Sequence, residues 1–358
     1  MSLAGQEFAG TMPVPERQRF DTAALERYLR GEIPGFTGPL TVEQFRGGQS
    51  NPTFLLTTGE GSRYVLRRKP AGQLLPSAHA VDREFRVTRA LHGHGVPVAQ
   101  PICLCEDQAV IGTMFYVMSY VRGRNFWDPR LPGVPPAERA AIYDEMNRVM
   151  VRLHSLDFAA LGLADYGKPG NYFTRQIARW SKQYRASETE RIEAMERLLT
   201  WLPANIPAGD ETALVHGDYR MDNMIFAADG PRMLAVVDWE LSTLGHPLAD
   251  FSYHVMLWRV EAGEIPGLKG IDLAALGIPT EAQYVARYCE RTGRAPIEPS
   301  VWEFCMAYNL FRIACIRQGI MRRVLEGTAA SRHAREAGER ARETAELAWR
   351  QVEEHLGG

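Results

Sequence analysis

The sequence has no segment long and apolar enough to span a membrane, and its first residues lack the basic stretch and apolar run of a secretion signal. Its charges nearly cancel, since a formal net charge of −2 leaves no whole-molecule attraction to nucleic acid or to anionic membranes. We therefore expect a cytoplasmic protein with no nucleic-acid or membrane partner, and the oligomeric state stays open. Cysteine is scarce, and the five residues lack the paired spacing of a zinc site, which indicates reduced thiols at Cys103, Cys105, Cys289, Cys305 and Cys315.

Two common nucleotide-binding signatures are also missing. No G-x-x-x-x-G-K-[ST] occurs, which argues against a Walker-type ATPase, and no G-x-G-x-x-G follows a strand as a dinucleotide site requires. His92 and His94 lie among glycines, so this segment is predicted to be a loop and not a metal site. Any nucleotide chemistry must therefore use a different loop.

What the sequence does contain is enough apolar residues, 45% of 358, to build two packed lobes. Residues 41–121 are rich in strand-type runs broken by Gly, Pro and Ser, with one helix predicted from about Ser77 to Leu91. Beyond Arg122 the apolar residues recur at helical spacing. We predict an α+β chain with a small N-terminal lobe (1–120), made of an antiparallel sheet and one main helix, and a larger, mostly helical lobe (121–358).

Two short apolar strands are predicted within the helical half, at 213–215 and 233–237, and an acidic motif follows each of them. Protein kinases place a base Asp in H-R-D-x-x-x-x-N and a magnesium-binding Asp in D-F-G after a later strand. Here Asp218, within H-G-D, leads to Asn223 at the same spacing, and Asp238 ends the second strand. A single Asp after a strand is usually a turn or cap residue. The joint match predicts Asp218 as the catalytic base, with Asn223 and Asp238 as catalytic magnesium ligands.

A nucleotide site is predicted in the strand-rich lobe. A glycine-rich loop between two strands, at Gly47, Gly48 and Ser50, can fold over ATP phosphates with its backbone N–H groups, although a plain hairpin turn gives the same pattern. The tetrapeptide Tyr-Val-Leu-Arg corresponds to V-A-I-K on the third kinase strand. Arg67 is therefore the favoured phosphate-binding cation, and Lys69, on the same strand face, is the alternative.

The helix of this lobe carries two candidates for the carboxylate that holds such a cation in kinases. Glu84 is the favoured partner, and Asp82 competes with it. Ordinary surface exposure is the alternative for either residue.

These segments resemble the aminoglycoside phosphotransferase superfamily, which includes choline and homoserine kinases and has a protein-kinase-like fold. The pattern H-G-D-Y-R-x-D-N matches residues 216–223, and V-D-W-E-L-S-x-x-G-H-P-x-x-D matches 237–250. The closest likeness is to the phosphotransferase domains fused to some acyl-CoA dehydrogenases. It extends to 64–70, to 74–87, and to Asn171-Tyr172-Phe173 with Gln176 and Trp180.

The resemblance implies further roles. ATP and magnesium are the implied cofactors, and adenine would meet the backbone of a hinge near Ser119, Tyr120 and Val121. Asp250 would brace the catalytic loop through backbone hydrogen bonds, although the start of a helix at Pro247 explains this Asp nearly as well.

We expect the acceptor to be a small-molecule hydroxyl compound, and the resemblance implies a hydroxyacyl-CoA or related anionic hydroxy compound. Arginines gathered in one distal helix agree with an anionic acceptor, although a solvated helix face is an equal alternative: Arg312, Arg317, Arg322 and Arg323. A second hypothesis is an aminoglycoside or choline-like amino alcohol held by aromatic residues, whose helical spacing also fits core packing: Tyr253, Trp258, Tyr284 and Tyr308. A third is a non-catalytic nucleotide-binding interaction module.

Overall fold

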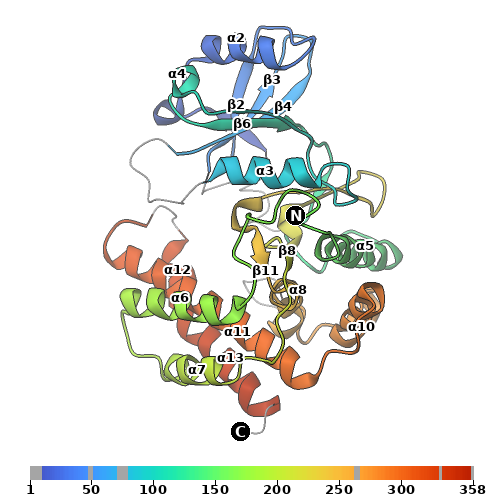
Figure 1. Ribbon diagram of the computed structural model, residues 1–358, viewed down its shortest axis with the longest axis vertical. Coiled ribbons are helices and arrows are strands. Elements are labelled where there is room, and N and C mark those ends of the chain that lie inside the picture. Colours follow the sequence, from blue (N-terminus) through green and yellow to red (C-terminus); the bar gives the residue numbers. More distant parts are fainter. Residues whose placement is uncertain (1–9, 47–50, 71–79, 262–266, 330–332, 356–358) are drawn as a thin grey trace.

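A computed structural model of the chain describes residues 10–46, 51–70, 80–261, 267–329 and 333–355. They form a sheet-rich lobe and a larger helical lobe, stacked along the long axis of the molecule (Figure 1). This two-lobed α+β architecture confirms the predicted fold class. The residues predicted to cover the phosphates, Gly47, Gly48 and Ser50, lie outside the described residues, and so does Ser77. The predicted lobe boundary after residue 120 stays a prediction.

The N-terminal lobe is built on one antiparallel sheet, in the strand order β1-β2-β3-β4-β6-β5. Helices α2 (Thr22–Glu32) and α4 (Gln108–Ile111) pack on its outer face, and α3 (Val81–Leu91) lies beneath it, towards the other lobe (Figure 1). The sequence did not predict β1, β5 or α2. The strands are β1 (Thr11–Pro13), β2 (Thr41–Phe45), β3 (Thr53–Thr57), β4 (Arg63–Arg68), β5 (Pro101–Cys105) and β6 (Phe115–Ser119).

Strand register decides which side chains of the sheet face the second lobe. Arg67 on β4 pairs with Tyr116 on β6, and Val65 pairs with Met118. Because side chains alternate between the two faces of a strand, all four share one face. Leu66, between them, is directed into the outer core with Phe54 and α2.

Two arginines fasten α3 to the helical lobe. The Arg83 guanidinium donates to the carbonyl of Tyr166 at 2.6 Å and to that of Ser242 at 3.4 Å, and it lies 4.1 Å from the centre of the Tyr166 ring. Arg86 donates to the carbonyl of Gly162 at 2.7 Å and pairs with Asp165. These contacts fix the helix against a segment that lies about eighty residues further along the chain.

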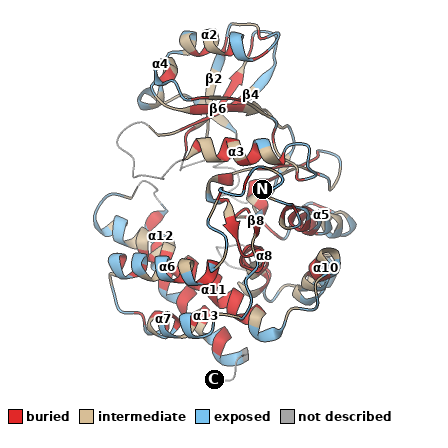
Figure 2. Ribbon diagram, in the orientation of Figure 1, coloured by how far each residue is buried: buried red, intermediate tan, exposed pale blue. Residues whose placement is uncertain are grey.

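The helical lobe is arranged around α11 (Pro299–Leu325), a 27-residue helix that is buried along most of its length (Figure 2). Residues 172–204 form two helices, and the first of them ends at Ser187. The Ser187 hydroxyl donates to the carbonyls of Gln183 and Tyr184. These bonds compete with the backbone hydrogen bonds that would continue the helix beyond Ser187. The surrounding helices are α5 (Pro136–His154), α6 (Tyr172–Ser187), α7 (Glu193–Ala204), α8 (Pro247–Val255), α9 (Leu273–Leu276), α10 (Glu281–Thr292), α12 (Ala334–Glu339) and α13 (Ala341–His355).

Two small sheets lie where the lobes meet. One has the order β10-β9-β7 and joins β7 (Arg124–Asn125), β9 (Met224–Phe226) and β10 (Met233–Val236). The other pairs β8 (Ala213–Val215) with β11 (Thr243–Gly245). The ends of β8 and β10 bring the two predicted acidic motifs together. Among the described residues, no helix has both the length and the apolar character needed to cross a bilayer.

Candidate active site

A buried carboxylate holds the loop that follows β8. The two oxygens of Asp250, on α8, accept hydrogen bonds from the backbone N–H groups of His216 and Gly217, both at 2.8 Å. His154 Nε2 contacts the same carboxylate at 3.2 Å. Burial raises the pKa of Asp250, but the hydrogen bond from His154 and the His216 amide outweigh it and keep the pKa below its ordinary value. Asp250 also lies in the first turn of α8, so both interpretations left open by the sequence describe it.

His216 connects the two acidic loops. Its Nε2 lies 3.1 Å from the carbonyl oxygen of Val237, and its Nδ1 lies 3.2 Å from the backbone nitrogen of Asp218. Both contacts are hydrogen bonds when the proton is on Nε2 and Nδ1 accepts. The ring is fully buried. It therefore sets the position of the residue before Asp238 relative to Asp218.

The carboxylate of Asp218 has partners on both oxygens. Oδ1 accepts a 2.6 Å hydrogen bond from the Tyr253 hydroxyl and lies 3.2 Å from Arg220 Nε, and Oδ2 accepts from Asn223 Nδ2 at 3.0 Å. Burial raises the pKa of Asp218, but the charge of Arg220 and the hydrogen bond from Tyr253 outweigh it, so the pKa lies below its ordinary value. Asp218 is thus an oriented, ionised carboxylate at neutral pH.

Asn223 and Asp238 line the same cleft from adjacent loops. The backbone N–H of Val237 donates to the Asn223 carbonyl at 2.9 Å, which joins the two loops next to these side chains. Asp238 has a left-handed backbone, with φ of 67°, a conformation that is uncommon outside glycine. Two oxygen-bearing side chains fit a magnesium ion, because this ion is usually held by one or two carboxylates together with substrate phosphates.

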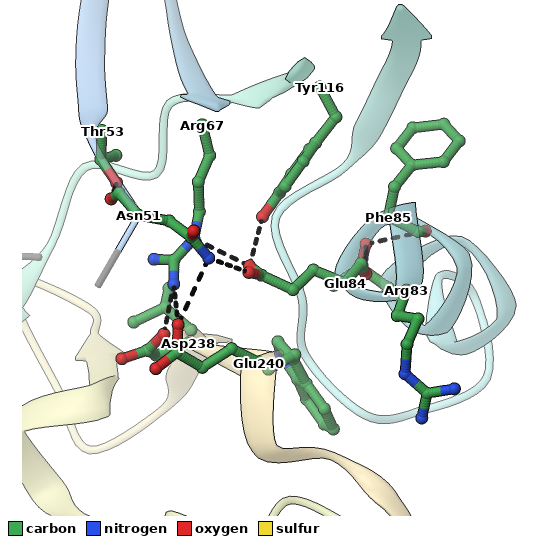
Figure 3. A network of polar contacts seen from close by, with 12 residues as sticks. Asn51, Thr53, Arg67, Arg83, Glu84, Phe85, Tyr116, Asp238 and Glu240 are labelled. Atoms are coloured by element: carbon green, nitrogen blue, oxygen red, sulfur yellow. Dashed lines mark hydrogen bonds and ion pairs between the residues drawn. The ribbon is translucent and has the colours of Figure 1, made fainter. Parts of the chain in front are cut away.

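A buried cation links the sheet to this cleft (Figure 3). The Arg67 guanidinium lies 2.8 Å from Glu84 on α3 through Nε, 2.5 Å from Asp238 through Nη2, and 3.2 Å from Glu240 through the same nitrogen. The alternative pair is also formed, since Lys69 Nζ lies 3.4 Å from Asp82. Only the Arg67 pair reaches Asp238, so Arg67 is the cation that geometry favours.

Glu84 is the most enclosed carboxylate of this network, at 1% exposed. It accepts hydrogen bonds from Asn51 at 2.8 Å and from the Tyr116 hydroxyl at 3.1 Å, in addition to its pair with Arg67. Burial raises the pKa of Glu84 to about 7, and the Arg67 charge limits the rise. The side chain therefore titrates near neutral pH.

The cleft between the lobes has a volume of about 730 Å³. The backbone segment Ser119, Tyr120 and Val121, which the resemblance assigns to the nucleotide, lines it together with Arg67, Asn223 and Asp238. Its walls carry apolar side chains from both lobes, which suit a flat aromatic base: Val65, Ala99, Met118, Ile225 and Val236. Glu84 lies behind Arg67, where it contacts the cation.

Several residues of this site were not predicted from the sequence. Tyr253 was considered only as an aromatic residue for a cationic acceptor, and its place one turn beyond Asp250 on α8 was the signal that it faces Asp218. Glu240 stands two residues after Asp238 and was not considered. Asp222, 2.9 Å from Arg220, lines the cleft as well, and burial raises its pKa.

The four arginines that the sequence places in one helix have different surroundings in the structure. Arg312 is buried beside the catalytic loop, whereas Arg317 contacts Thr344 on α13, Arg322 pairs with Glu326, and Arg323 is exposed. The solvated-face alternative therefore describes Arg322 and Arg323 but not Arg312, because 3.6 residues per turn spreads these positions around and along the helix. Of the aromatic group, Trp258, Tyr284 and Tyr308 belong to the core of the lobe.

Comparisons with known proteins agree with this geometry. The family model described as "Phosphotransferase enzyme family" matches residues 41–299. A crystal structure of a candidate aminoglycoside phosphotransferase from Ralstonia eutropha is 55% identical with a TM-score of 0.86, and the match covers 94% of this chain and 99% of that one.

Two further matches differ in kind. Acyl-CoA dehydrogenase family member 10 of Mus musculus is 47% identical over 343 residues, which is 95% of this chain and 32% of that protein, so the chain spans about a third of this relative. An aminoglycoside phosphotransferase in a ternary complex with ADP and hygromycin B shares the fold at 16% identity, with a TM-score of 0.59 and coverage of 92% and 98%.

Proposed function

The chain belongs to the phosphotransferase enzyme family and is a kinase, and from this premise we propose that it transfers the γ-phosphoryl group of ATP to a hydroxyl group of a small molecule. The observation that carries the proposal is that Asn223 and Asp238 line the interlobe cleft together with Arg67, while the Asp218 carboxylate accepts a hydrogen bond from Asn223 next to them. Phosphoryl transfer requires a positioned acceptor and neutralised phosphate charge, and these residues can meet both needs.

In this mechanism Asp218 orients the acceptor hydroxyl and takes its proton. A weakly basic carboxylate suffices, because the loose transition state leaves the proton on the acceptor until bond formation is advanced. Tyr253 and Asn223 hold the carboxylate from either side. Asn223 and Asp238 would hold the magnesium ion, which neutralises phosphate charge when bound.

The nucleotide is assigned to the 730 Å³ cleft. Its base would lie between Val65 and Ile225, at the backbone of residues 119–121, with Arg67 directed at the phosphates. The solved complex with ADP in a protein of the same fold supports a nucleotide here. Gly47, Gly48 and Ser50 stay candidates for the phosphate-covering loop.

For the acceptor we propose a hydroxyacyl-CoA or a related anionic hydroxy compound. The relative named for acyl-CoA dehydrogenase supports this class. The buried guanidinium of Arg312 beside the catalytic loop supports it as well, since it would repel a polycation. An aminoglycoside or a choline-like amino alcohol is the second candidate, and Tyr253 is the aromatic side chain that reaches the site.

An ADP-release assay separates these proposals. The protein is incubated with ATP and magnesium, and hydroxybutyryl-CoA, kanamycin and choline are added in turn. We expect release that depends on hydroxybutyryl-CoA and disappears in Asp218→Asn. Strong turnover of kanamycin or choline would replace the anionic acceptor with the second candidate. Nucleotide binding without transfer to any hydroxyl compound would favour a non-catalytic module.

A further inference from the structure

Arg312 is one of three buried arginines in the described part of the chain, with Arg67 and Arg68. It lies on α11 with 8% of its surface exposed, and its Nη2 donates a 2.8 Å hydrogen bond to the carbonyl of Gly217, the residue before Asp218. The guanidinium carbon lies 5.1 Å from the centre of the Tyr253 ring and 5.8 Å from the Trp180 ring. Three separate elements thus hold this cation next to the catalytic loop.

What the cation lacks is a carboxylate of its own. Across the described ranges, no Asp or Glu oxygen lies within 4.0 Å of the Arg312 guanidinium. Arg259, in the same lobe, shows the usual arrangement, because Glu281 and Glu303 both bind it. Asp218 acts on Arg312 only electrostatically, from beyond that distance. Among the described residues, the buried Arg68 likewise has hydrogen bonds, to Gln18, and no ion pair. Burying such a charge is costly unless polar groups compensate it. The single hydrogen bond to Gly217 leaves most of the five N–H donors of Arg312 for another partner.

We propose that Arg312 is a specificity-determining residue that binds the carboxyl group of a hydroxy acid acceptor, either as the free carboxylate or as its thioester carbonyl. The proposal rests on the phosphotransferase function given above. Since Arg312 touches the residue adjoining Asp218, the group that it binds lies within a few bonds of the hydroxyl that Asp218 receives. The rings of Tyr253 and Trp180 hold the planar guanidinium, and its in-plane donors suit a carboxyl oxygen.

The test compares acceptors that differ in this one group. Hydroxybutyryl-CoA, free hydroxybutyrate and butanediol share a hydroxyl-bearing chain, and only butanediol lacks the carboxyl oxygen. In Arg312→Gln we expect kcat/KM for the preferred carboxyl-bearing acceptor to fall roughly 100-fold, mainly through KM, because one partner of a buried charge contact is removed. Turnover of butanediol, measured at high concentration, should change by less than about threefold.

Two controls separate recognition from a structural effect. Arg312→Lys keeps the charge and should recover part of the lost affinity, and Arg322→Gln changes an exposed arginine of the same helix and should match the wild type. Comparing the free acid with the thioester shows which form of the carboxyl group is bound. An equal fall for all three acceptors in Arg312→Gln would assign Arg312 to loop support through Gly217 and overturn the proposal.

Calorimetric titration with the same acceptors, in the presence of a non-hydrolysable ATP analogue and magnesium, tests the inference apart from turnover. Binding that Arg312→Gln weakens, without ADP release in any variant, would retain the Arg312 site and reject the proposed phosphoryl transfer. Turnover of butanediol by the wild type as efficient as that of the carboxyl-bearing acceptors would reject the Arg312 site and retain the transfer. Absence of both binding and turnover would reject both.

Discussion

The Tyr253 hydroxyl donates a 2.6 Å hydrogen bond to Asp218, on the carboxylate oxygen that also faces Arg220. Removing it in Tyr253→Phe should lower kcat/KM by roughly 10- to 150-fold, since hydrogen bonds to charged groups contribute about 1.5–3 kcal/mol. The same bond lowers the pKa of Asp218, so the variant's pKa rises but stays far below neutral. The loss should therefore be constant between about pH 6 and 8. A pH-rate profile measures this, and a loss confined to the acid side would contradict it.

Substitutions at Asp218 and at Asp238 should differ in their effect on the affinity for magnesium-ATP. Asp218→Asn removes the proton acceptor, so transfer should fall by about a thousandfold while the affinity for magnesium-ATP stays within about threefold. Asp238→Asn should weaken magnesium-ATP binding as well, because Asp238 faces both the cleft and Arg67. Titration of each variant with ATP, with and without magnesium, provides the measurement. Equal affinities for magnesium-ATP in the two variants would remove Asp238 from the metal site.

Asp250 should be a main contributor to the stability of the helical lobe. Asp250→Ala leaves the buried N–H groups of His216 and Gly217 without an acceptor, and we expect a loss of about 3–5 kcal/mol in the free energy of unfolding. Because the pKa of this carboxyl is lowered in the folded state, its contribution is present at neutral pH and is lost as pH falls below about 4. Urea unfolding at pH 7 and pH 3.5 tests both statements. If the urea midpoint of Asp250→Ala at pH 7 equalled that of the wild type, the hydrogen bonds from His216 and Gly217 to Asp250 would not be needed for stability.

The titration of Glu84 should lower kcat/KM for ATP on the acid side of the pH-rate profile, which we call the acid limb. Its pKa is raised to about 7, so below that pH the protonated form loses its charge pairing with Arg67. We expect kcat/KM for ATP to rise with pH around this value, and Glu84→Gln to be about tenfold less active with the limb removed. An unchanged acid limb in Glu84→Gln would assign it to another group.

The raised pKa of Glu84 also predicts a trend in stability. The folded state holds this proton more tightly than the unfolded chain, whose value is near 4.5, so the contribution of Glu84 to stability declines as pH rises from about 4.5 to 7. The difference in unfolding free energy between wild type and Glu84→Gln, measured by urea unfolding across this range, should follow that direction. A difference that does not change with pH would contradict the raised pKa.

Much of the fold followed from local patterns. The strand at 213–215 was predicted with the bounds that the structure has, because the signal of an apolar strand lies in a few neighbouring residues. The helix after residue 80 begins at Val81, later than expected, with Ala80 as a cap that makes no side-chain hydrogen bond. Helix starts without a capping side chain leave little signal in the sequence.

The candidate site was predicted unevenly for a physical reason. Asp218, Asn223 and Asp238 belong to motifs whose spacing within one loop is fixed by the chemistry. Tyr253 and Arg312 reach Asp218 and Gly217 from helices 35 and 95 residues further on, and no spacing rule connects such positions. Whether Arg312 faced solvent or the loop depended on the rotation of α11, which only packing decides.

The attachment of α3 by Arg83 and Arg86 bears on how activity can be controlled. In kinases that are switched, the corresponding helix moves and takes its glutamate away from the cation until a signal arrives. Here Glu84 already contacts Arg67, and α3, which carries it, is bonded to backbone carbonyl groups of the helical lobe. Moving α3 as those kinases do would first break the hydrogen bonds of Arg83 and Arg86 to these carbonyl groups.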